Sequence, residues 1–459
     1  MEATLSNTER KLFGTDGVRG IANVDPMTPE IAMALGRAVA VMFPGGAGRT
    51  RILIGKDTRI SCYMFENALA AGICSMGADV ILVGPIPTPG IAYLTIGNRA
   101  DAGVVISASH NPFMDNGIKF FGRDGFKLPD EIELRMEEYV LNPSRLPPVA
   151  TGKDFGRASR IDDAVGRYCV YLKSQLPRDM SLEGIRIGLD CANGAGYKVA
   201  PLVFSELGAE VVTIGDKPDG TNINESCGAL HPKALGRKVR EMRCDVGLAL
   251  DGDGDRAMLV DENGEIVNGD GVLAICAHEM HVEGRLKGGG VVGTTMSNLG
   301  LELALARDGL TLARTDVGDR YVVERMLADG YNLGGEQSGH LLFLDHSTTG
   351  DGILSGLMVL ETMLRTGKRL SELAGIYEQF PQVNYSRAVV DRPPIETLSQ
   401  TNEAIRAVQA ELGAQGRVVV RYSGTSKKIR VMVEGRDEGK VQAYAEQILQ
   451  ACGRDEILA

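Results

Sequence analysis

One structural unit recurs three times along this 459-residue chain, and it constrains the fold more than any other feature of the sequence. Each copy reads as a strand, a helix, a strand and a second helix that leads to an unusual polar loop. The first two copies share a recognisable segment, since GADVILVG at 77–84 resembles GAEVVTIG at 208–215. Alternating strands and helices predict βαβ crossovers and mostly parallel sheets. The expected strands are Arg51–Gly55, Val80–Val83, Ala102–Ile106, Ile185–Asp190, Val211–Ile214, Val246–Leu250, Gly290–Gly293 and Leu310–Arg314, and the expected helices lie near Cys62–Met76, Val199–Leu207, Pro232–Arg243, Leu299–Arg307 and Gly318–Leu327.

The chain changes character beyond about residue 375. Two β-rich runs, Arg417–Arg421 and Ile429–Glu434, are joined by a polar turn and followed by a helix near Lys440–Ala451. We therefore expect an α/β fold of three similar α/β domains with mixed, mostly parallel sheets, plus a smaller C-terminal α+β domain. The expected domains are 1–150, 151–256, 257–374 and 375–459, with linkers at Asn142–Phe155 and Asp391–Pro394.

The charge balance limits the partners that we expect for this chain. Acidic residues outnumber basic ones by 60 to 49, for a formal net charge of −11, whereas duplex nucleic acid is bound by Lys and Arg. An anionic ligand would need a local cationic cleft. The eight cysteines include no C-x-x-C pair and read as reduced thiols. The N-terminus lacks the apolar core of a signal peptide, and prolines break the uncharged stretch Val80–Gly97, so we expect a cytoplasmic protein with no membrane segment.

The first polar loop is Ser107–Pro112, which directly follows a buried strand. In an open α/β sheet the functional loops lie just past the carboxyl ends of the strands. Ser109 and His110 are therefore placed where a reacting hydroxyl would be useful. Considered alone, the same residues also fit a polar turn closed by Asn-Pro.

Two cations near this loop are further candidates. Arg19 ends the glycine-rich segment Lys11–Gly20, and a flexible loop could bring its charge to a transferring phosphoryl group. Lys119 could act as a general acid or base if burial removes its side chain from water. A structural salt bridge is the alternative for each residue.

The second polar loop places carboxylates at Asp251, Asp253 and Asp255, with glycines between them. Hard cations such as Mg²⁺ take oxygen ligands of this kind, so the loop predicts a divalent-metal site. Glu262 stands at the twelfth position, as the last ligand of an EF-hand would, but Arg256 occupies the position where that motif requires glycine.

Two more polar loops follow. The segment 334–340 offers the polar groups of Glu336, Gln337, Ser338 and His340, which suit the hydroxyls or the amine of a sugar and equally suit a surface turn. The segment 421–430 gathers four cations with serine and threonine hydroxyls and a glycine, an arrangement that favours phosphate. A solvated hairpin turn is the alternative for this last segment.

Two other patterns carry no prediction. The glycines at 288–293 match a dinucleotide fingerprint but precede a strand instead of following one, which weighs against a nucleotide-dependent oxidoreductase. Cys276, His278 and His281 resemble zinc ligands, yet a fourth ligand is missing and the setting reads as an amphipathic helix.

Taken together and in order, the four polar loops resemble those of the α-D-phosphohexomutases, and the resemblance covers essentially the whole chain. Ser107–Pro112 is similar to the phosphoserine loop of that family, Asp251–Arg256 to its magnesium loop, Gly335–His340 to its sugar-binding loop, and Arg421–Thr425 to its phosphate clamp. The resemblance implies the following residues: catalytic Ser109, His110, Lys119 and Arg19; metal ligands Ser109, Asp251, Asp253 and Asp255; substrate-binding Glu336, Gln337, Ser338, His340, Arg421, Ser423, Gly424, Thr425, Arg430 and Arg256.

The resemblance also implies an activity. Gln337 is typical of the members that interconvert glucosamine 6-phosphate and glucosamine 1-phosphate for amino-sugar nucleotide and cell-wall precursor synthesis, whereas members acting on mannose or glucose phosphate usually carry Met there. The implied cofactors are one Mg²⁺ per active site, phosphorylated Ser109 and a sugar bisphosphate activator, and the expected state is a monomer or homodimer. A mannose or glucose phosphate mutase and a catalytically silent phosphosugar-binding protein are the alternatives.

One departure from the family pattern lies in the clamp, where Ser426, Lys427 and Lys428 replace the usual continuation Glu-Pro and make the turn more cationic. The implied reaction passes through a sugar bisphosphate that turns over between two phosphoryl transfers. Turning over requires the clamp domain to loosen, so we expect a hinge at 375–395.

Overall fold

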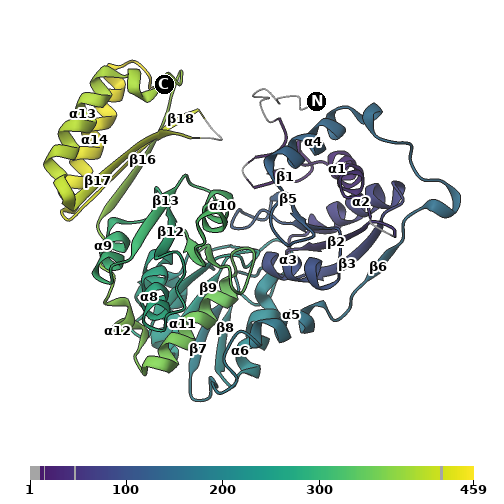
Figure 1. The fold of residues 1–459 in the computed structure, drawn as a ribbon, viewed down its shortest axis with the longest axis horizontal. Helices are drawn as coiled ribbons and strands as arrows, with labels where there is room; N and C mark the ends of the chain where they lie inside the picture. The colour runs from purple at the N-terminus through teal and green to yellow at the C-terminus, as the bar shows by residue number, and fades with distance from the viewer. Residues whose placement is uncertain (1–10, 15, 46–47, 424–426, 459) are drawn as a thin grey trace.

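The computed structural model describes residues 11–14, 16–45, 48–423 and 427–458. Four sheets follow one another along the chain, and each has helices packed on it (Figure 1). The N-terminal and C-terminal domains lie at opposite ends of the molecule, and the two middle domains connect them. The expected fold class, with three mixed α/β sheets and a smaller C-terminal domain, is confirmed.

The first sheet has six strands in the order β1-β5-β4-β2-β3-β6. Alternate residues of its central strands bury on opposite faces, because side chains alternate along a strand. Ile52 and Ile54 join a core with the first two helices, whereas Leu53 faces a core that contains the third helix. The elements are β1 (Val18–Ile21), α1 (Pro29–Met42), β2 (Arg51–Lys56), α2 (Cys62–Ser75), β3 (Asp79–Pro85), α3 (Thr88–Gly97), β4 (Ala102–Ile106), β5 (Asp115–Gly122), α4 (Asp130–Leu141) and β6 (Ala158–Arg160).

The second sheet has the order β11-β10-β9-β7-β8 and the third has the order β13-β12-β14-β15. Asp351 caps the long buried helix α11, since its carboxylate accepts the N–H groups of Ile353 and Leu354. The elements are α5 (Ala164–Lys173), β7 (Arg186–Asp190), α6 (Val199–Glu206), β8 (Glu210–Ile214), α7 (Lys233–Met242), β9 (Val246–Leu250), β10 (Ala257–Asp261), β11 (Ile266–Val267), α8 (Gly269–Val282), β12 (Gly290–Thr294), α9 (Leu299–Arg307), β13 (Thr311–Thr315), α10 (Asp319–Asp329), β14 (Leu333–Gly335), β15 (Leu341–Phe343), α11 (Gly352–Thr366) and α12 (Leu370–Ala374).

Each of the first three polar loops is the turn of an antiparallel pair. The pairs are β4 with β5, β9 with β10, and β14 with β15. The sequence pattern predicted the strands before the first two loops, β4 and β9, but not strand β14 before the third loop, nor any of the three returning strands. The returning strands explain why the loops are short and held at both ends.

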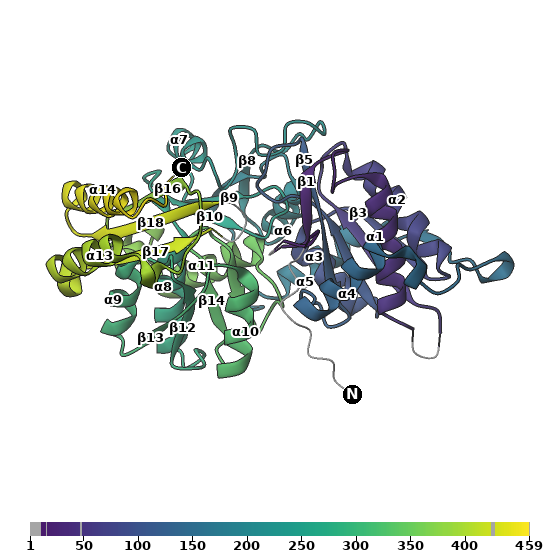
Figure 2. The ribbon, with the colours of Figure 1, turned by 90° about the horizontal axis from the view of Figure 1, so that it is seen from above.

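The C-terminal sheet is antiparallel, in the order β16-β18-β17, with two helices packed on it (Figure 2). It comprises β16 (Gln382–Ala388), α13 (Ser399–Leu412), β17 (Gly416–Tyr422), β18 (Lys428–Gly435) and α14 (Glu438–Arg454). Because β16 already belongs to this sheet, the expected linker Asp391–Pro394 is a connection inside the domain, and the linker prediction is wrong there.

The sheets also extend past two of the expected boundaries. Strand β6, after residue 150, pairs with β3, and strands β10 and β11, after residue 256, pair within the second sheet. A strand must stay with the partner that satisfies its backbone N–H and C=O groups. Composition changes along the chain therefore mark these domains only approximately.

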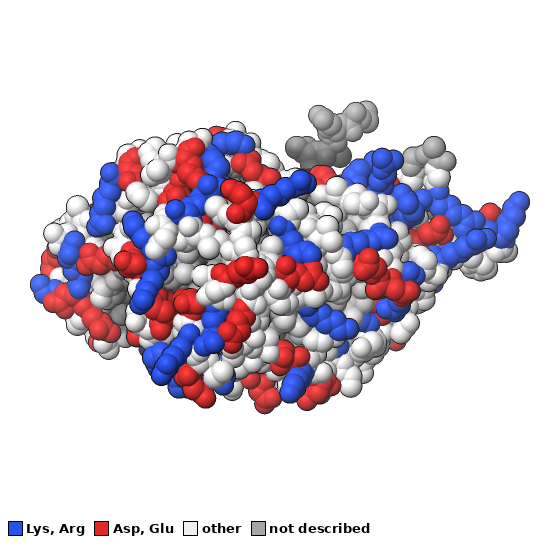
Figure 3. All heavy atoms as spheres, turned by 90° about the horizontal axis from the view of Figure 1, so that it is seen from below, with Lys and Arg blue, Asp and Glu red and all other residues white. Residues whose placement is uncertain are grey.

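All eight cysteines are free thiols, seven of them buried and Cys74 half-buried. Lys, Arg, Asp and Glu are interspersed over the face seen in Figure 3, so the net charge of −11 is not concentrated on that face. Among the helices of the described residues, none has the length and apolarity that a membrane crossing requires.

Candidate active site

The centre of the site is the meeting of the first two polar loops. Ser109 follows β4 and Asp251 follows β9, and the Ser109 hydroxyl donates to Asp251 Oδ2 at 2.6 Å. Ser109 is buried and has a backbone φ of +52°, a left-handed conformation that non-glycine residues adopt at a cost. His110 Nδ1 lies 3.2 Å from the Ser109 hydroxyl. The structure therefore brings a serine hydroxyl, an imidazole and a carboxylate together.

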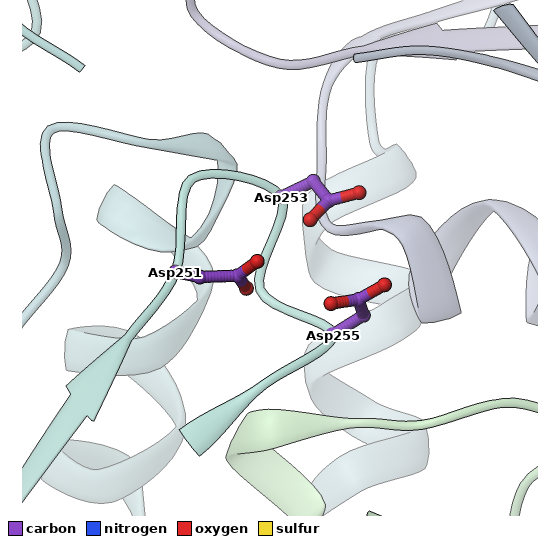
Figure 4. A group of neighbouring side chains, drawn as sticks. All are labelled: Asp251, Asp253 and Asp255. Carbon is purple, nitrogen blue, oxygen red and sulfur yellow. The ribbon is translucent and has the colours of Figure 1, made fainter. Parts of the chain in front are cut away.

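Asp251, Asp253 and Asp255 turn their carboxylates toward one another from one loop (Figure 4). All three are buried, with one oxygen of each within 4.8 Å of the others. Burial and the two neighbouring carboxylates raise the pKa of Asp251 well above its usual range. One buried oxygen of Asp253 and one of Asp255 have no hydrogen-bond partner among the described residues. Such a donor set fits a divalent cation, which would offset the repulsion and satisfy those oxygens.

The EF-hand arrangement is excluded. Glu262 lies outside the aspartate group, because its carboxylate accepts hydrogen bonds from the N–H and hydroxyl of Ser371.

Lys119 lies on β5, buried beside the aspartates. Its ammonium is 3.0 Å from Asp253 Oδ2 and 3.2 Å from Asp16 Oδ2. Burial alone would lower the pKa of Lys119, but the carboxylates of Asp16 and Asp253 outweigh it, and the pKa is raised. Lys119 is therefore a fixed positive charge in this structure.

Arg19 lies on strand β1, paired with Gly117 of β5, and not on a flexible loop as expected. The reason is that Val18–Ile21 completes the edge of the first sheet. Arg19 pairs with Asp16, and both line a cavity that Ser109 also borders. The prediction of its position in a loop is wrong, whereas its nearness to Ser109 holds.

His110 carries no charge at neutral pH. Burial and the nearby guanidinium groups of Arg256 and Arg19 lower the pKa of His110 to about 4. A neutral imidazole beside the Ser109 hydroxyl can accept a hydrogen bond or a proton from it.

The third loop joins the second through backbone contacts. Arg256 forms an isolated β-bridge with His340, and the Ala257 N–H donates to the carbonyl of Gly339 at 3.0 Å. His340 lies 3.6 Å from both Asp255 and Asp319. Burial opposes the charged imidazole, but these two carboxylates raise the pKa of His340 above its ordinary value.

A cavity of about 520 Å³ lies between these loops. Glu336, which accepts a hydrogen bond from Ser338 at 3.1 Å, borders this cavity. Gln337 is not among the described residues that line it, and its side chain lies beside Tyr377 instead. The lining residues are Leu12, Gly14, Asp16, Gly17, Arg19, Ser109, Lys127, Asp255, Arg256, Val317, Gly318, Asp319, Glu336 and His340.

The fourth loop lies in the C-terminal domain. Arg421 of β17 stands directly opposite Arg430 of β18, and like charges placed so destabilise a sheet. Burial and the neighbouring Arg430 lower the pKa of Arg421. Both arginines line a second hollow of about 280 Å³. Val317 borders this hollow and the catalytic cavity, so the two sites adjoin.

The remaining clamp residues are only partly described. Ser423 is buried, and its N–H donates to the carbonyl of Lys428 at 2.9 Å. Gly424 and Thr425, like Ser426 of the departure from the family pattern, lie outside the described residues.

The structure adds site residues that the sequence reasoning missed. Lys127 pairs with both Asp16 and Asp319, and so joins the first domain to helix α10 across the cavity wall. Thr88, at the start of α3, donates its N–H to the Asp253 carbonyl at 2.9 Å and its hydroxyl to Asp253 Oδ2 at 2.7 Å. Thr88 follows strand β3, so the carboxyl-end rule could have found it; Lys127 and Asp319 carry no local signal.

Models of one protein family match the chain in four consecutive parts. They are the phosphoglucomutase/phosphomannomutase alpha/beta/alpha domain I at residues 10–145, domain II at 167–264 and domain III at 268–380, and the C-terminal domain at 368–451.

Similar proteins are found over nearly the whole chain. A phosphoglucosamine mutase from Geobacter sp. (strain M21) is 58% identical over 439 residues, covering 96% of this chain and 97% of the relative. A phosphoglucosamine mutase from Magnetococcus marinus is 55% identical, covering 97% of this chain and 92% of the relative.

Solved structures share the fold at lower identity. A phosphoglucomutase/phosphomannomutase family protein from Burkholderia thailandensis has a TM-score of 0.79 at 22% identity, over 96% of this chain and 97% of the other. An Aspergillus fumigatus N-acetylphosphoglucosamine mutase, solved with GlcNAc-6P and magnesium, has a TM-score of 0.68 at 17% identity, over 98% and 96%.

Proposed function

The chain belongs to the phosphoglucomutase/phosphomannomutase family, and from this membership we propose that it acts as a phosphoglucosamine mutase. It would interconvert glucosamine 6-phosphate and glucosamine 1-phosphate through a phosphorylated Ser109 and a sugar bisphosphate. The observation that carries the proposal is the Ser109 hydroxyl, held 2.6 Å from a buried aspartate cluster at a cavity that adjoins a pair of arginines. Identity of 55–58% to proteins named phosphoglucosamine mutase supports the choice of sugar.

Asp251, Asp253 and Asp255 would hold the magnesium ion, together with an oxygen at Ser109. When bound, the ion supplies positive charge to a phosphoryl group in transfer. Arg19 borders the cavity beside Ser109 and would add a second positive charge near that phosphoryl group. The ammonium of Lys119, paired with Asp253, offsets part of the negative charge of the three aspartates.

Each transfer exchanges one phosphorus–oxygen bond for another. The bond to Ser109 breaks as a bond to a sugar hydroxyl forms, and the proton of that hydroxyl must reach the serine oxygen. His110, neutral and 3.2 Å from that oxygen, is placed to move this proton. The return transfer runs the same exchange with the other phosphate of the sugar bisphosphate.

The remote end of the substrate would lie on Arg421 and Arg430. Their mutual repulsion is relieved when a phosphate dianion lies between them, and guanidinium groups bind such anions with two hydrogen bonds. Glu336, Ser338 and His340 would contact the sugar between the two phosphates. Arg256 would contact the substrate from the adjoining loop, and Ser423 with Gly424 and Thr425 would complete the clamp.

A second candidate is a mutase acting on mannose or glucose phosphate. The observation in its favour is that Gln337, the residue that favoured glucosamine, does not belong to the described lining of the cavity. An assembly as a monomer or homodimer, a cytoplasmic location and the lack of nucleic-acid or membrane partners remain predictions.

A substrate panel tests the proposal. The purified protein is incubated with Mg²⁺, a trace of hexose 1,6-bisphosphate and either glucosamine, mannose or glucose 6-phosphate, and ³¹P NMR follows the products. We expect glucosamine 1-phosphate to form fastest. Faster conversion of mannose or glucose phosphate would overturn the choice of sugar, and no conversion of any sugar would favour a phosphosugar-binding protein.

A further inference from the structure

Arg59 is a fully buried arginine whose side chain faces the phosphoserine loop. It follows β2 and is 0% exposed. Its Nη2 donates to the carbonyls of Ser109 at 2.9 Å and Asn111 at 2.8 Å. Its Nη1 donates to the carbonyls of Asp115 at 3.1 Å and Pro112.

The fifth donor of this guanidinium is also used. Nε of Arg59 donates to Asp57 Oδ2 at 2.8 Å, so the five N–H groups have five acceptors. Three of these acceptors are carbonyls of the loop that carries Ser109, and a fourth is the carbonyl of Asp115, where β5 begins. A buried guanidinium is stable only with such complete pairing. The conformation of the loop and the position of the Arg59 side chain therefore depend on each other.

The N–H side of Ser109 is tied to the same group. Asp57 Oδ2 accepts the Ser107 hydroxyl at 2.6 Å, and that hydroxyl accepts the Ser109 N–H at 2.8 Å. The peptide groups on both sides of Ser109 thus connect to the Asp57–Arg59 pair.

The second domain reaches the same carbonyls. Asn224 Nδ2 donates to the carbonyl of Ser109 at 2.9 Å and to that of Asn111 at 3.1 Å. These are the two carbonyls that Arg59 Nη2 holds from the first domain. The Ser109 carbonyl therefore accepts hydrogen bonds from two domains at once.

These hydrogen bonds from two domains account for the unusual backbone conformation of Ser109. A left-handed φ of +52° costs roughly 1–2 kcal/mol for a non-glycine residue and persists only where surrounding contacts impose it. Arg59 and Asn224 supply those contacts, and the result is a hydroxyl directed at Asp251. Among the described residues that line the catalytic cavity, neither Arg59 nor Asn224 appears.

We infer that Arg59 and Asn224 are positioning residues that together fix Ser109 in its reactive geometry without touching the substrate. The inference rests on the proposed function, since it presupposes that Ser109 exchanges a phosphoryl group. It makes the reactivity of Ser109 depend on the docking of the second domain onto the first.

A single-turnover experiment tests this. Dephosphorylated protein is mixed with Mg²⁺ and glucose 1,6-bisphosphate, and intact mass spectrometry follows the phosphorylation of Ser109. Arg59→Lys keeps the charge but loses the five-donor fork, and its rate constant should fall about 10²-fold. Asn224→Ala leaves Arg59 on the same carbonyls, and its rate constant should fall about 10-fold.

The rate constant separates positioning from folding. A merely structural role would lower the fraction of protein that reacts and leave the rate constant of the reacting fraction unchanged. The control is Arg186→Lys, an exposed arginine that also bonds a backbone carbonyl, that of Met242 at 3.0 Å. This variant should match the wild type.

Three outcomes decide the matter. Rate constants of Arg59→Lys and Asn224→Ala within about 3-fold of the wild type would overturn the inference while leaving the proposed function intact. If Arg59→Lys does not fold, Asn224→Ala decides, because it removes only a side chain at the seam between domains. A wild-type protein whose Ser109 takes up no phosphate would overturn the proposed function and the inference with it.

Discussion

The seam between the first two domains and the seam before the C-terminal domain are built differently. At the first, Thr88 and Asn224 donate hydrogen bonds directly to Asp253 and Ser109, and the hydroxyl of Thr58 donates to the Asn193 carbonyl at 2.6 Å. At the second, the hydrogen bonds lie away from the two arginines of the clamp. Arg417 donates to the Ser297 carbonyl at 2.8 Å.

The connecting segment shows the same contrast. The carboxamide of Asn298 pairs with both the N–H and the C=O of Phe380, each at 3.0 Å, just before the C-terminal sheet begins. The C-terminal domain is thus held near its base, whereas Arg421 and Arg430 are free of bonds to the catalytic loops among the described residues. The loop that carries Ser109 is therefore held by direct hydrogen bonds between domains, whereas the described clamp arginines are not, a difference that fits the turning intermediate of the proposed mechanism.

Ser109→Ala tests the loop that carries Ser109 and has the largest expected effect. Without the hydroxyl no phosphoryl group can be carried, so turnover should fall on the order of 10⁴-fold or more. Coupled assay of hexose phosphate conversion measures it, with thermal unfolding to show that the fold persists. Retention of a tenth of the activity would mean that this loop is not the reaction centre.

Thr88→Val sharpens the comparison at the first seam. The variant loses the hydroxyl that orients Asp253, so Mg²⁺ affinity measured by calorimetry should fall about 10–100-fold. Thr95→Val is the matched control, because Thr95 lies on the same helix and bonds the Ile91 carbonyl. Equal Mg²⁺ affinities for the two variants would contradict an interdomain role for Thr88.

Arg421→Ala probes the clamp arginines. Removing one charge of the pair should raise KM about 10-fold, since Arg430 remains, and leave kcat within about 3-fold. Arg387→Ala, at an exposed arginine on β16 at the far edge of the same sheet, should change neither constant. A fall in kcat with KM unchanged would place the Arg421 interaction in the transition state and erase the distinction between the clamp and the loop that carries Ser109.

Asp270 gives the smallest effect, a pH dependence of stability near the second seam. Burial is the main cause that raises the pKa of Asp270 to about 7, while its carboxylate accepts the Asn298 N–H at 2.8 Å. Because the folded protein favours the protonated form of Asp270, the free energy of unfolding is highest below about pH 4, where the carboxyl is protonated in both states. This contribution of Asp270 to stability is lost as the pH rises through about 7.

The Asp270→Asn variant removes that titration. Its Tm should change less between pH 5 and pH 8 than the wild-type Tm, by a few degrees. Asp391→Asn, at an exposed position, should follow the wild type. Parallel profiles for Asp270→Asn and the wild type would show that this carboxyl does not titrate in the range.

The repeated unit and its polar loops could be predicted because each rests on local pattern. Strands such as β4 and β9 are short apolar runs, and their carboxyl ends locate Ser109 and Asp251. The returning strands β10 and β15 were missed because short strands paired within a hairpin carry little periodicity of their own. Arg19 was assigned to a loop for the same reason, since its glycine neighbours mask the edge strand β1.

Residues that act through other residues were the hardest to find. Asp57 and Arg59 follow β2, so the rule that located Ser109 would also have located them, but nothing local reveals that Arg59 faces five acceptors. Asn224 and Lys127 depend on how domains dock, which no short pattern encodes. Gln337 is the opposite case, a residue that the sequence pattern singled out for sugar preference. In the structure it lies beside Tyr377 and is not among the described residues that line the cavity.

The buried thiols have a practical consequence. A cysteine in a packed core reacts with an alkylating reagent only when that core opens, so its labelling rate reports the free energy of local opening. Because every one of the four domains contains at least one buried thiol, pulse labelling followed by peptide mass spectrometry would time the opening of each domain separately in the unmodified protein. The reporters are Cys62 in the first domain, Cys169, Cys191, Cys227 and Cys244 in the second, Cys276 in the third and Cys452 in the last.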